Sequence, residues 1–339
     1  MTSALKKWPS QFKYDPIKSL LQSGNAAIRY FTERDLLDNN AGPIETIWNL
    51  PDVQKILKKQ KPDGSWNLGK KEINPGQHYR LTETWKQLRF LIDQYEMNKS
   101  HNAIQKACEY IFSCQSREGD IRGILANQYA PYYTGAILYL LIKAGYRNDK
   151  RVDKGIRWLL DMRQNDGGWV IGSPGMISRT WKEICVLTSK WTPGPKKDFD
   201  KSKPFSAAGT GMAIRALAVH PEYRHSEEAK RAALLLKSKF LKKDNWSWYQ
   251  HPDNWIRFQF PYWWNHLVSA LDMVSLIGIS KEDPDVQTAL QWFIEHQEKS
   301  GLWKLSYSKI HKVSKKEKSS ETRLWITLCI CRIFKRLVG

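Results

Sequence analysis

The sequence predicts an all-α protein built from about five repeats, each a pair of helices joined through a glycine–tryptophan turn. The first observation is a turn motif that recurs five times, with successive copies starting 55, 49, 79 and 54 residues apart. The copies read QKPDGSW at 60–66, QSREGD at 115–120 (followed by Ile121 instead of tryptophan), QNDGGW at 164–169, KDNWSW at 243–248 and QEKSGLW at 297–303. The second observation is a segment of helical apolar period before and after every copy. Together they indicate an array of repeated helix pairs.

These segments define two sets of predicted helices. Those before the turns carry charge on one face, as outer helices do, and span 53–59, 103–114, 152–162, 227–241 and 286–296. Those after the turns are more apolar, as expected for inner helices packed on both sides, and span 81–95, 132–144, 207–219, 263–277 and 321–337. Glycine or asparagine allows the positive φ at which a helix stops. The tryptophan is expected to cover the helix end and to donate through its indole N–H.

The chain is expected to form a single domain over residues 1–339. Residues 51–338 hold the repeats, and 170–205 form an insertion loop within the longest interval between turns. Residues 1–50 form either an additional helix pair or an N-terminal cap. The helix-like segment 25–37, which has no turn motif of its own, favours the pair.

Helix pairs of this kind stack into an open superhelix or close into a ring. The turn motif resembles the Q-x-x-[DG]-G-x-W turn of the terpenoid cyclase and protein prenyltransferase toroids, over roughly residues 50–338. The resemblance implies a single α/α toroid of about five to six helix pairs with long loops on one face. The family's D-x-D-D acid motif and G-C-G-E-Q thioester motif are absent, and Cys185 lacks the Asp and His companions of the prenyltransferase zinc site. The resemblance therefore implies the fold and leaves the activity open.

The composition is that of a folded chain, with 41% hydrophobic residues. No stretch approaches the roughly 18 consecutive apolar residues of a bilayer span, and the N-terminus has no apolar signal region. The five cysteines (Cys108, Cys114, Cys185, Cys329 and Cys331) fit reduced thiols in a cytoplasm better than a disulfide frame. No histidine or cysteine spacing predicts a metal site, and no motif predicts a cofactor.

The chain carries a large excess of positive charge. Lys and Arg number 54 against 34 Asp and Glu, a formal net charge of +20. A field of this size attracts polyanions such as nucleic acid, acidic polysaccharide or an anionic membrane surface, although it also serves solubility alone. The loops after the turns share one mouth of the predicted ring with the inner-helix N-termini, whose dipoles favour anions. These loops hold about 18 Lys and Arg and about 8 Asp and Glu, so about half of the net charge is expected there.

Basic residues of this mouth are candidate phosphate ligands, although any single run of them is also explained as a solvated loop. They are Lys70, Lys71, Arg122, Lys196, Lys197, Lys201, Lys203, Lys309, Lys312, Lys315 and Lys316. The tryptophans and tyrosines of 246–264 belong to the same mouth. Cations interleaved with rings suit phosphate contacts combined with base stacking, and the alternative for the rings is an aromatic core plug.

Three carboxylates near this mouth are candidate catalytic groups. Glu83 and Glu321 stand in similar Glu-Thr helix starts of the first and last repeats, which would be neighbours in a closed ring, and Asp253 lies in an aromatic loop. The structural alternatives are acids favoured by a helix dipole and a turn residue. The other predicted pocket residues offer acid–base, phosphate-clamping or stacking groups. They are His78, Arg80, Tyr132, Trp255, Arg257, Tyr262, Trp263 and His266.

These features favour an enzyme that acts on DNA, most concretely a DNA glycosylase that hydrolyses an N-glycosidic bond. Carboxylates and aromatic walls suit an oxocarbenium-like transition state, and an extruded nucleotide needs a basic surface and stacking rings. One alternative is an isoprenoid or isoprenoid-diphosphate cyclase or transferase, with the diphosphate at the basic mouth and the chain among the rings. Another is a lyase or binding module for acidic polysaccharide, or a scaffold without catalysis.

Overall fold

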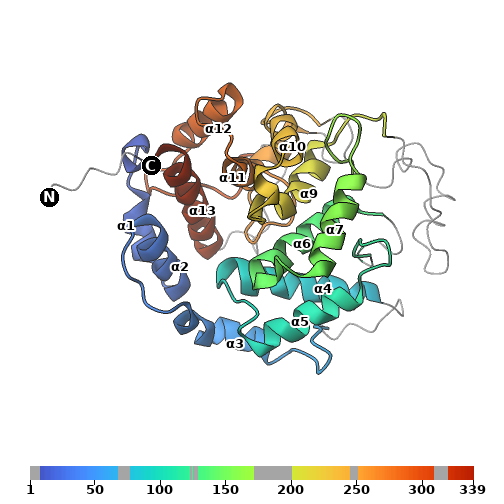
Figure 1. Ribbon diagram of the computed structural model, residues 1–339. Helices are drawn as coiled ribbons and strands as arrows, with labels where there is room; N and C mark the ends of the chain where they lie inside the picture. The colour runs from blue at the N-terminus through green and yellow to red at the C-terminus, as the bar shows by residue number, and fades with distance from the viewer. Residues whose placement is uncertain are drawn as a thin grey trace.

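Two concentric layers of helices form a ring (Figure 1). The computed structural model describes residues 8–67, 77–122, 124, 129–171, 201–244, 251–308 and 320–339. Within these ranges the regular elements are helices, and the few extended pairings are isolated bridges and not strands. The predicted all-α toroid of helix pairs is therefore confirmed.

The described helices alternate between the outer and the inner layer along the chain. The outer helices are α1 (Pro16–Leu21), α3 (Pro51–Leu57), α5 (Asn102–Ser113), α7 (Lys150–Asp161), α10 (Glu227–Lys237) and α12 (Pro284–Glu295). The inner helices are α2 (Ala26–Phe31), α4 (Gln77–Arg89), α6 (Pro131–Leu141), α9 (Ala207–Val219), α11 (Leu267–Ile277) and α13 (Ser320–Val338). Short 3₁₀ turns span Pro9–Gln11, Ile44–Asn49, Tyr223–His225 and Pro252–Ile256. Three inner helices continue into π-helical turns, α2 into Thr32–Leu36, α4 into Phe90–Gln94 and α6 into Ile142–Tyr146.

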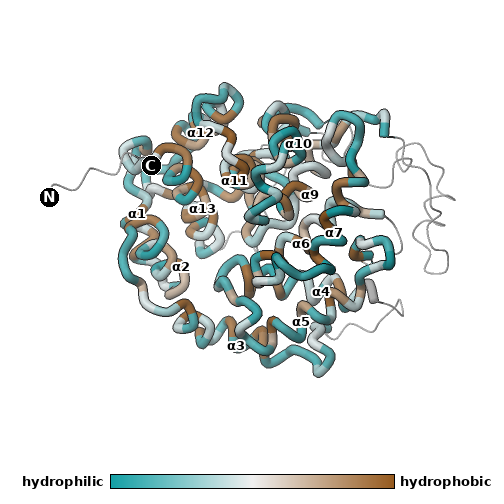
Figure 2. The backbone as a smooth tube through the Cα atoms, in the orientation of Figure 1, coloured by the Kyte–Doolittle hydropathy of each residue, from teal (hydrophilic) through white to brown (hydrophobic). Residues whose placement is uncertain are grey.

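Burial explains which helix takes which layer. Every residue of α6 is buried, whereas α5 buries only the single stripe expected of an outer helix, Ile104, Ala107, Cys108, Ile111 and Phe112. In Figure 2 the rim of the ring is largely hydrophilic and the hydrophobic positions lie between the layers. Inner helices also approach closely, because a Cβ added at Gly135 of α6 would lie 2.5 Å from the carbonyl oxygen of Ala213 in α9.

The tryptophan of the turn motif closes the end of the preceding outer helix. The indole N–H groups of Trp66, Trp169 and Trp303 each donate to a carbonyl ten residues earlier, at 2.9, 2.8 and 2.8 Å. All three side chains are fully buried. The backbone N–H of Trp169 also donates to Thr210 Oγ1 in the first turn of α9. The motif therefore joins the two helices of a pair, as the sequence predicted.

The glutamine of the motif joins one pair to the next. Gln60 Nε2 donates to the carbonyl of Ala103 in α5 at 2.7 Å, and Gln115 Nε2 donates to Arg151 in α7 at 2.8 Å. Gln297 exchanges two hydrogen bonds with the backbone of Tyr14, 2.8 Å at its Nε2 and 3.0 Å at its Oε1. This last pair of bonds connects the last helix pair to the first and closes the ring.

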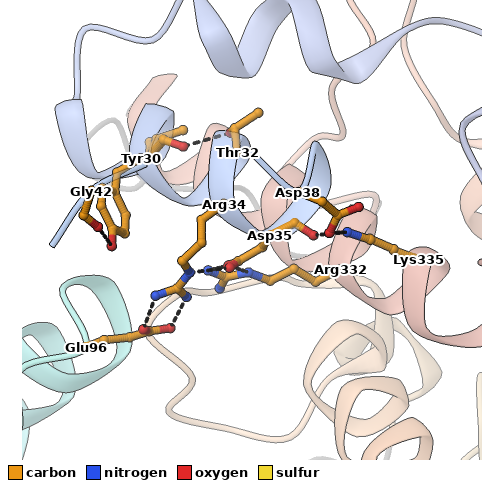
Figure 3. A network of polar contacts seen from close by, with 10 residues as sticks. Tyr30, Thr32, Arg34, Asp35, Asp38, Gly42, Glu96, Arg332 and Lys335 are labelled. Atoms are coloured by element: carbon orange, nitrogen blue, oxygen red, sulfur yellow. Dashed lines mark hydrogen bonds and ion pairs between the residues drawn. The ribbon is translucent and has the colours of Figure 1, made fainter. Parts of the chain in front are cut away.

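A polar network closes the inner layer between α13, α2 and the end of α4 (Figure 3). Arg34 donates to both oxygens of Glu96 at 2.7 and 2.8 Å, and Asp35 accepts from Arg332 Nε at 2.8 Å. Lys335 pairs with Asp38. Burial alone would raise the pKa of Asp35, but the neighbouring guanidinium groups of Arg332 and Arg34 outweigh it and hold that pKa below its usual range.

Some details differ from the prediction. Helix α11 begins at Leu267 and not at Trp263, because His266 caps it by accepting from the backbone N–H of Ser269. Trp263 and Trp264 consequently belong to the preceding loop. Cys108, Cys114, Cys329 and Cys331 are buried free thiols, and Cys185 lies outside the described residues. Among the described helices, none combines the length and the apolar character needed to cross a membrane.

Candidate functional site in the lumen of the ring

A segment of the loop before α11 lies across the lumen of the ring. This central segment, residues 260–265, is held by two arginines from the inner layer. Arg89 Nη2 donates to the carbonyl of Pro261 at 2.5 Å, and Arg215 Nη1 donates to that of Tyr262 at 3.1 Å. Both guanidinium groups are almost fully buried, and burial lowers the pKa of each. The inner helices α4 and α9 therefore fix the backbone of the central segment.

The central segment completes an aromatic wall with Trp85 of α4 and the first turn of α6. Trp263 meets Trp85 edge to face with ring centroids 4.9 Å apart, and Trp85 meets Tyr133 at 5.5 Å. Trp264 lies 6.4 Å from Tyr133, and Tyr132 packs on Tyr133 at 4.7 Å. Because the turns and the inner-helix N-termini share one mouth, this wall lies on the turn side of the lumen.

Charged groups of α4 stand against this wall. Glu83 is buried and accepts from Lys86 Nζ at 2.6 Å through Oε1. Lys86 Nζ lies 5.5 Å from the ring centroid of Trp263, and the Arg89 guanidinium lies 4.8 Å from it. Both cations are therefore placed for cation–π contacts with the same indole.

Three buried polar atoms of this wall have no hydrogen-bond partner within the described part of the chain. They are Glu83 Oε2 and the indole nitrogens of Trp85 and Trp263. A buried polar group left unsatisfied costs about 1–3 kcal/mol. Native structures meet such groups with water or a ligand, so this is where a polar group of a bound molecule is expected.

The three predicted catalytic carboxylates do not meet. Glu321 accepts from Asn25 Nδ2 at 2.8 Å and lines a separate cavity of about 340 Å³ with Tyr95 and Leu324. Helix α2 lies beside α13, so the predicted adjacency of the first and last turn repeats fails because the α1–α2 pair stands between them (Figure 1). Asp253 accepts from Ser308 Oγ at 2.6 Å in another part of the ring.

The predicted pocket residues divide between the lumen and the scaffold. Tyr132, Tyr262 and Trp263 reach the lumen, Tyr132 through the wall and the other two in the central segment. His266 is a buried helix cap, and burial lowers its pKa to about 3. Trp255 donates to the Lys242 carbonyl at 2.9 Å and covers the end of α10. His266 and Trp255 are therefore engaged in structural contacts, His266 as a helix cap and Trp255 through its indole N–H.

The other basic and polar predictions lie at the surface or outside the described residues. Arg257 is exposed, as is Arg80, which pairs with Asp63 at 3.5 Å. Arg122 is engaged by Asp120 at 2.6 Å and by the ring of Tyr129 at 4.4 Å. Lys201 and Lys203 are exposed. The side chain of His78 and residues Lys70, Lys71, Lys196, Lys197, Lys309, Lys312, Lys315 and Lys316 lie outside the described part, so the basic mouth stays a prediction.

Sequence reasoning missed the residues that organise the lumen. Arg215 is a charge in the middle of the apolar helix AAGTGMAIRALAV, and such a residue is rarely buried without a dedicated partner. That signal was available. Arg89, Trp85 and Lys86 carried no comparable signal, because each fits an ordinary amphipathic helix.

Comparison with known proteins finds similarity to a cyclase over part of the chain. No family model matches the chain. The squalene–hopene cyclase of Zymomonas mobilis is 30% identical over 129 residues, which cover 34% of this chain. The chain spans 18% of the length of that curated relative. The observed ring is an α/α toroid, and the match to a squalene–hopene cyclase covers about a third of the chain.

Solved structures with related architecture are distant. A type II terpene cyclase from Scytonema, in its apo form, shares 13% identity over 84% of this chain and 95% of its own, with a TM-score of 0.31. The same enzyme in complex with geranylgeranyl dihydroxybenzoate gives 12% identity, the same coverage and a TM-score of 0.33. A protein from Actinoplanes gives 13% identity over 84% of this chain and 96% of its own, with a TM-score of 0.31. Superpositions with scores this low do not bear on function.

The prediction of a DNA glycosylase, of N-glycosidic hydrolysis and of a nucleic-acid partner is wrong. The curated relative is a cyclase, and nothing in the match points to nucleic acid. The error came from the net charge, which reports on attraction to polyanions in general and not on the chemistry of a pocket. The described lumen presents aromatic rings and paired charges, with no free array of cations for a phosphate backbone.

Proposed function

We propose that the chain is an isoprenoid cyclase-like enzyme that holds a polyprenyl substrate against the aromatic wall on the turn side of the lumen. The observation that carries the proposal is the juxtaposition of Trp85, Tyr133 and Trp263 with the buried carboxylate of Glu83. It is supported by the 30% identity with a squalene–hopene cyclase over 129 residues.

The wall suits a substrate that is apolar at first and cationic during reaction. Burial of an isoprenoid chain on aromatic rings is worth about 25 cal/mol for each Å² of apolar surface removed from water. The faces of the same rings attract a carbocation as it develops, because their quadrupoles present negative potential. Edge-to-face packing, as between Trp85 and Trp263, fixes those faces before the substrate arrives.

Glu83 is assigned a charge-stabilising role. Its Oε1 accepts from Lys86, and its Oε2 has no partner within the described residues. An ionised carboxylate stabilises a nearby cation. It can also end the reaction by removing a proton next to the cationic carbon. The C–H bonding pair then becomes a new C=C bond, and Oε2 receives the proton.

Product analysis tests this proposal. The full chain is incubated with isoprenoids of C15 to C30, with and without a diphosphate, and the extracts are examined by gas chromatography and mass spectrometry. Glu83→Gln is expected to lower product formation at least about 100-fold, the usual cost of removing one preorganised charge-stabilising group. Glu109→Gln is the matched control, because Glu109 pairs with Arg151 at 2.6 Å on the outer layer.

Two outcomes contradict the proposal. The first is that no substrate is converted and none raises the melting temperature of the protein. The second is that turnover occurs and Glu83→Gln lowers it no more than Glu109→Gln does.

A further inference from the structure

A second cavity occupies the other end of the lumen. It has a volume of about 630 Å³, within the range of about 300–1,000 Å³ typical of small-molecule sites. Its lining comes from the C-terminal parts of α6, α9, α11 and α13, from the turns that follow α2, α4 and α6, and from Phe260 and Tyr262 of the central segment. Glu83, Trp85 and Trp263 are not among its lining residues. The central segment therefore stands between this cavity and the aromatic wall.

The lining of this cavity is unsuited to an isoprenoid chain, because it is dominated by charge. Five basic residues line it, Arg34, Lys143, Arg332, Lys335 and Arg336, and five acidic residues, Asp35, Asp38, Asp93, Glu96 and Asp272. Their formal charges cancel. The cations are already engaged in ion pairs, for example Arg34 with Glu96 at 2.7 Å and Arg336 with Asp272 at 2.9 Å. An anionic ligand would have to break these pairs.

The backbone of the inner helices favours a cation over an anion in this cavity. The C-terminal end of a helix carries the equivalent of about half a negative charge, and several such ends converge on this cavity. Three of the inner helices end in π-helical turns, an irregularity that is frequent at functional sites. The turn after α2 contributes Arg34 and Asp35 to the lining, the turn after α4 contributes Asp93, and the turn after α6 contributes Lys143.

One buried acceptor at the floor of the cavity is unused. The Asp93 side chain is 1% exposed. Its Oδ1 accepts from Tyr139 Oη at 2.8 Å and from Lys143 Nζ at 2.7 Å. Its Oδ2 is buried and has no partner within the described residues. The nearby Arg89 and Arg215 do not line the cavity and donate to the carbonyls of the central segment, and the Nε of each is buried without a partner within the described residues.

We propose that this cavity binds a small organic cation that carries an amine or guanidine group. An N–H of the ligand donates to Asp93 Oδ2. This binding is independent of the proposed cyclase activity, because the two sites share no charged residue.

Calorimetric titration of the full chain tests the proposal. Spermidine and agmatine are the cationic probes and inorganic pyrophosphate is the anionic one, all at low ionic strength. At least one amine is expected to bind in a 1:1 ratio with a Kd below about 1 mM. Asp93→Asn is expected to weaken binding at least about tenfold, because a charge-assisted hydrogen bond is lost.

A matched control and a second variant separate binding from folding. Asp153 of α7 accepts from Tyr223 Oη at 3.2 Å and pairs with Arg157 at 2.8 Å, so it copies the Asp93 arrangement on the outer layer. Asp153→Asn is expected to leave amine binding unchanged. If Asp93→Asn does not fold, Val219→Trp, which fills the cavity and keeps Asp93, is expected to abolish binding.

Three results would overturn the proposal. One is that neither amine binds the wild-type chain. Another is that pyrophosphate binds the wild-type chain and the amines do not. The third is that an amine binds as tightly to a folded Asp93→Asn or Val219→Trp variant as to the wild type.

Discussion

Closure of the ring by Gln297 makes a quantitative prediction for the substitution Gln297→Leu. The side chain is 7% exposed and makes three hydrogen bonds, to the N–H and carbonyl of Tyr14 and to the carbonyl of Gly301. Leucine has a similar volume and satisfies none of these groups. The two bonds to Tyr14 are only partly buried, which reduces the penalty there.

The expected loss of unfolding free energy follows from these contacts. Each Tyr14 group contributes about 1 kcal/mol and the buried Gly301 carbonyl about 1–3 kcal/mol, which gives a total of about 3–5 kcal/mol. Gln115→Leu is the matched substitution within the ring. Gln115 makes two such bonds, to Gly119 at 2.7 Å and Arg151 at 2.8 Å. Its loss is expected to be about 2–4 kcal/mol, because the Gly119 carbonyl is buried like that of Gly301.

Two measurements check this reasoning. Urea unfolding followed by circular dichroism gives the free energies of unfolding. Limited trypsin digestion reports whether the first helix pair has separated, through cleavage at Lys13 and Lys18. Gln297→Leu is expected to accelerate cleavage at these lysines at least about tenfold, because local opening follows the lost free energy. Equal cleavage in Gln297→Leu and Gln115→Leu would refute the closing role of Gln297.

Three further predictions concern the packing of the ring. Gly135→Ala adds helix propensity worth about 1 kcal/mol, yet it is expected to destabilise the fold by about 1–3 kcal/mol because its Cβ would lie 2.5 Å from the Ala213 oxygen. A higher melting temperature of this variant would contradict the close contact. His266 has a pKa of about 3 when folded and 6.5 as its ordinary value. The unfolded chain therefore takes up the proton first, and stability should fall by about 2 kcal/mol between pH 7 and pH 5. His266→Asn, which keeps a helix cap, should lose that slope in unfolding titrations at both pH values, and an unchanged slope would exclude this assignment. Trp169→Phe removes a buried bond of 2.8 Å to the Leu159 carbonyl and should cost about 1–3 kcal/mol in urea unfolding, whereas an unaltered midpoint would show that the bond contributes nothing.

The helix pairs were predictable because their signals are local. The segment 103–114 became α5 over Asn102–Ser113, since apolar period and turn residues act within one or two helical turns. The alternation of outer and inner helices followed from the same pattern. The starts of α4 and α11 and the end of α10 each differ from the prediction by four residues. For α11 the reason is that the aromatic run before it has the pattern of a helix, whereas residues 263–265 belong to the central segment.

The lumen was not predictable in the same way. Arg89 and the carbonyl of Pro261 are 172 residues apart in the chain, and no short-range pattern indicates that they meet. The carboxylate Glu83 was found because it starts an inner helix. Its supposed partner Glu321 was misplaced because the count of turn motifs left out the α1–α2 pair, which has none. The DNA glycosylase prediction was wrong because it relied on the net charge. Net charge is a sum over the surface and carries no information about a cavity.

The glutamine contacts have a consequence for how such a chain can evolve. An open array of repeats grows or shrinks by whole units and needs polar caps on its two end faces. In this ring the last glutamine binds the first pair, so no end faces remain to be capped. The six described pairs share one full circle, and the loss or duplication of a pair would leave a gap or a clash rather than a shorter or longer array. The geometry of the ring thus fixes the number of repeats. Changes of sequence are then accommodated in the loops and in the lumen.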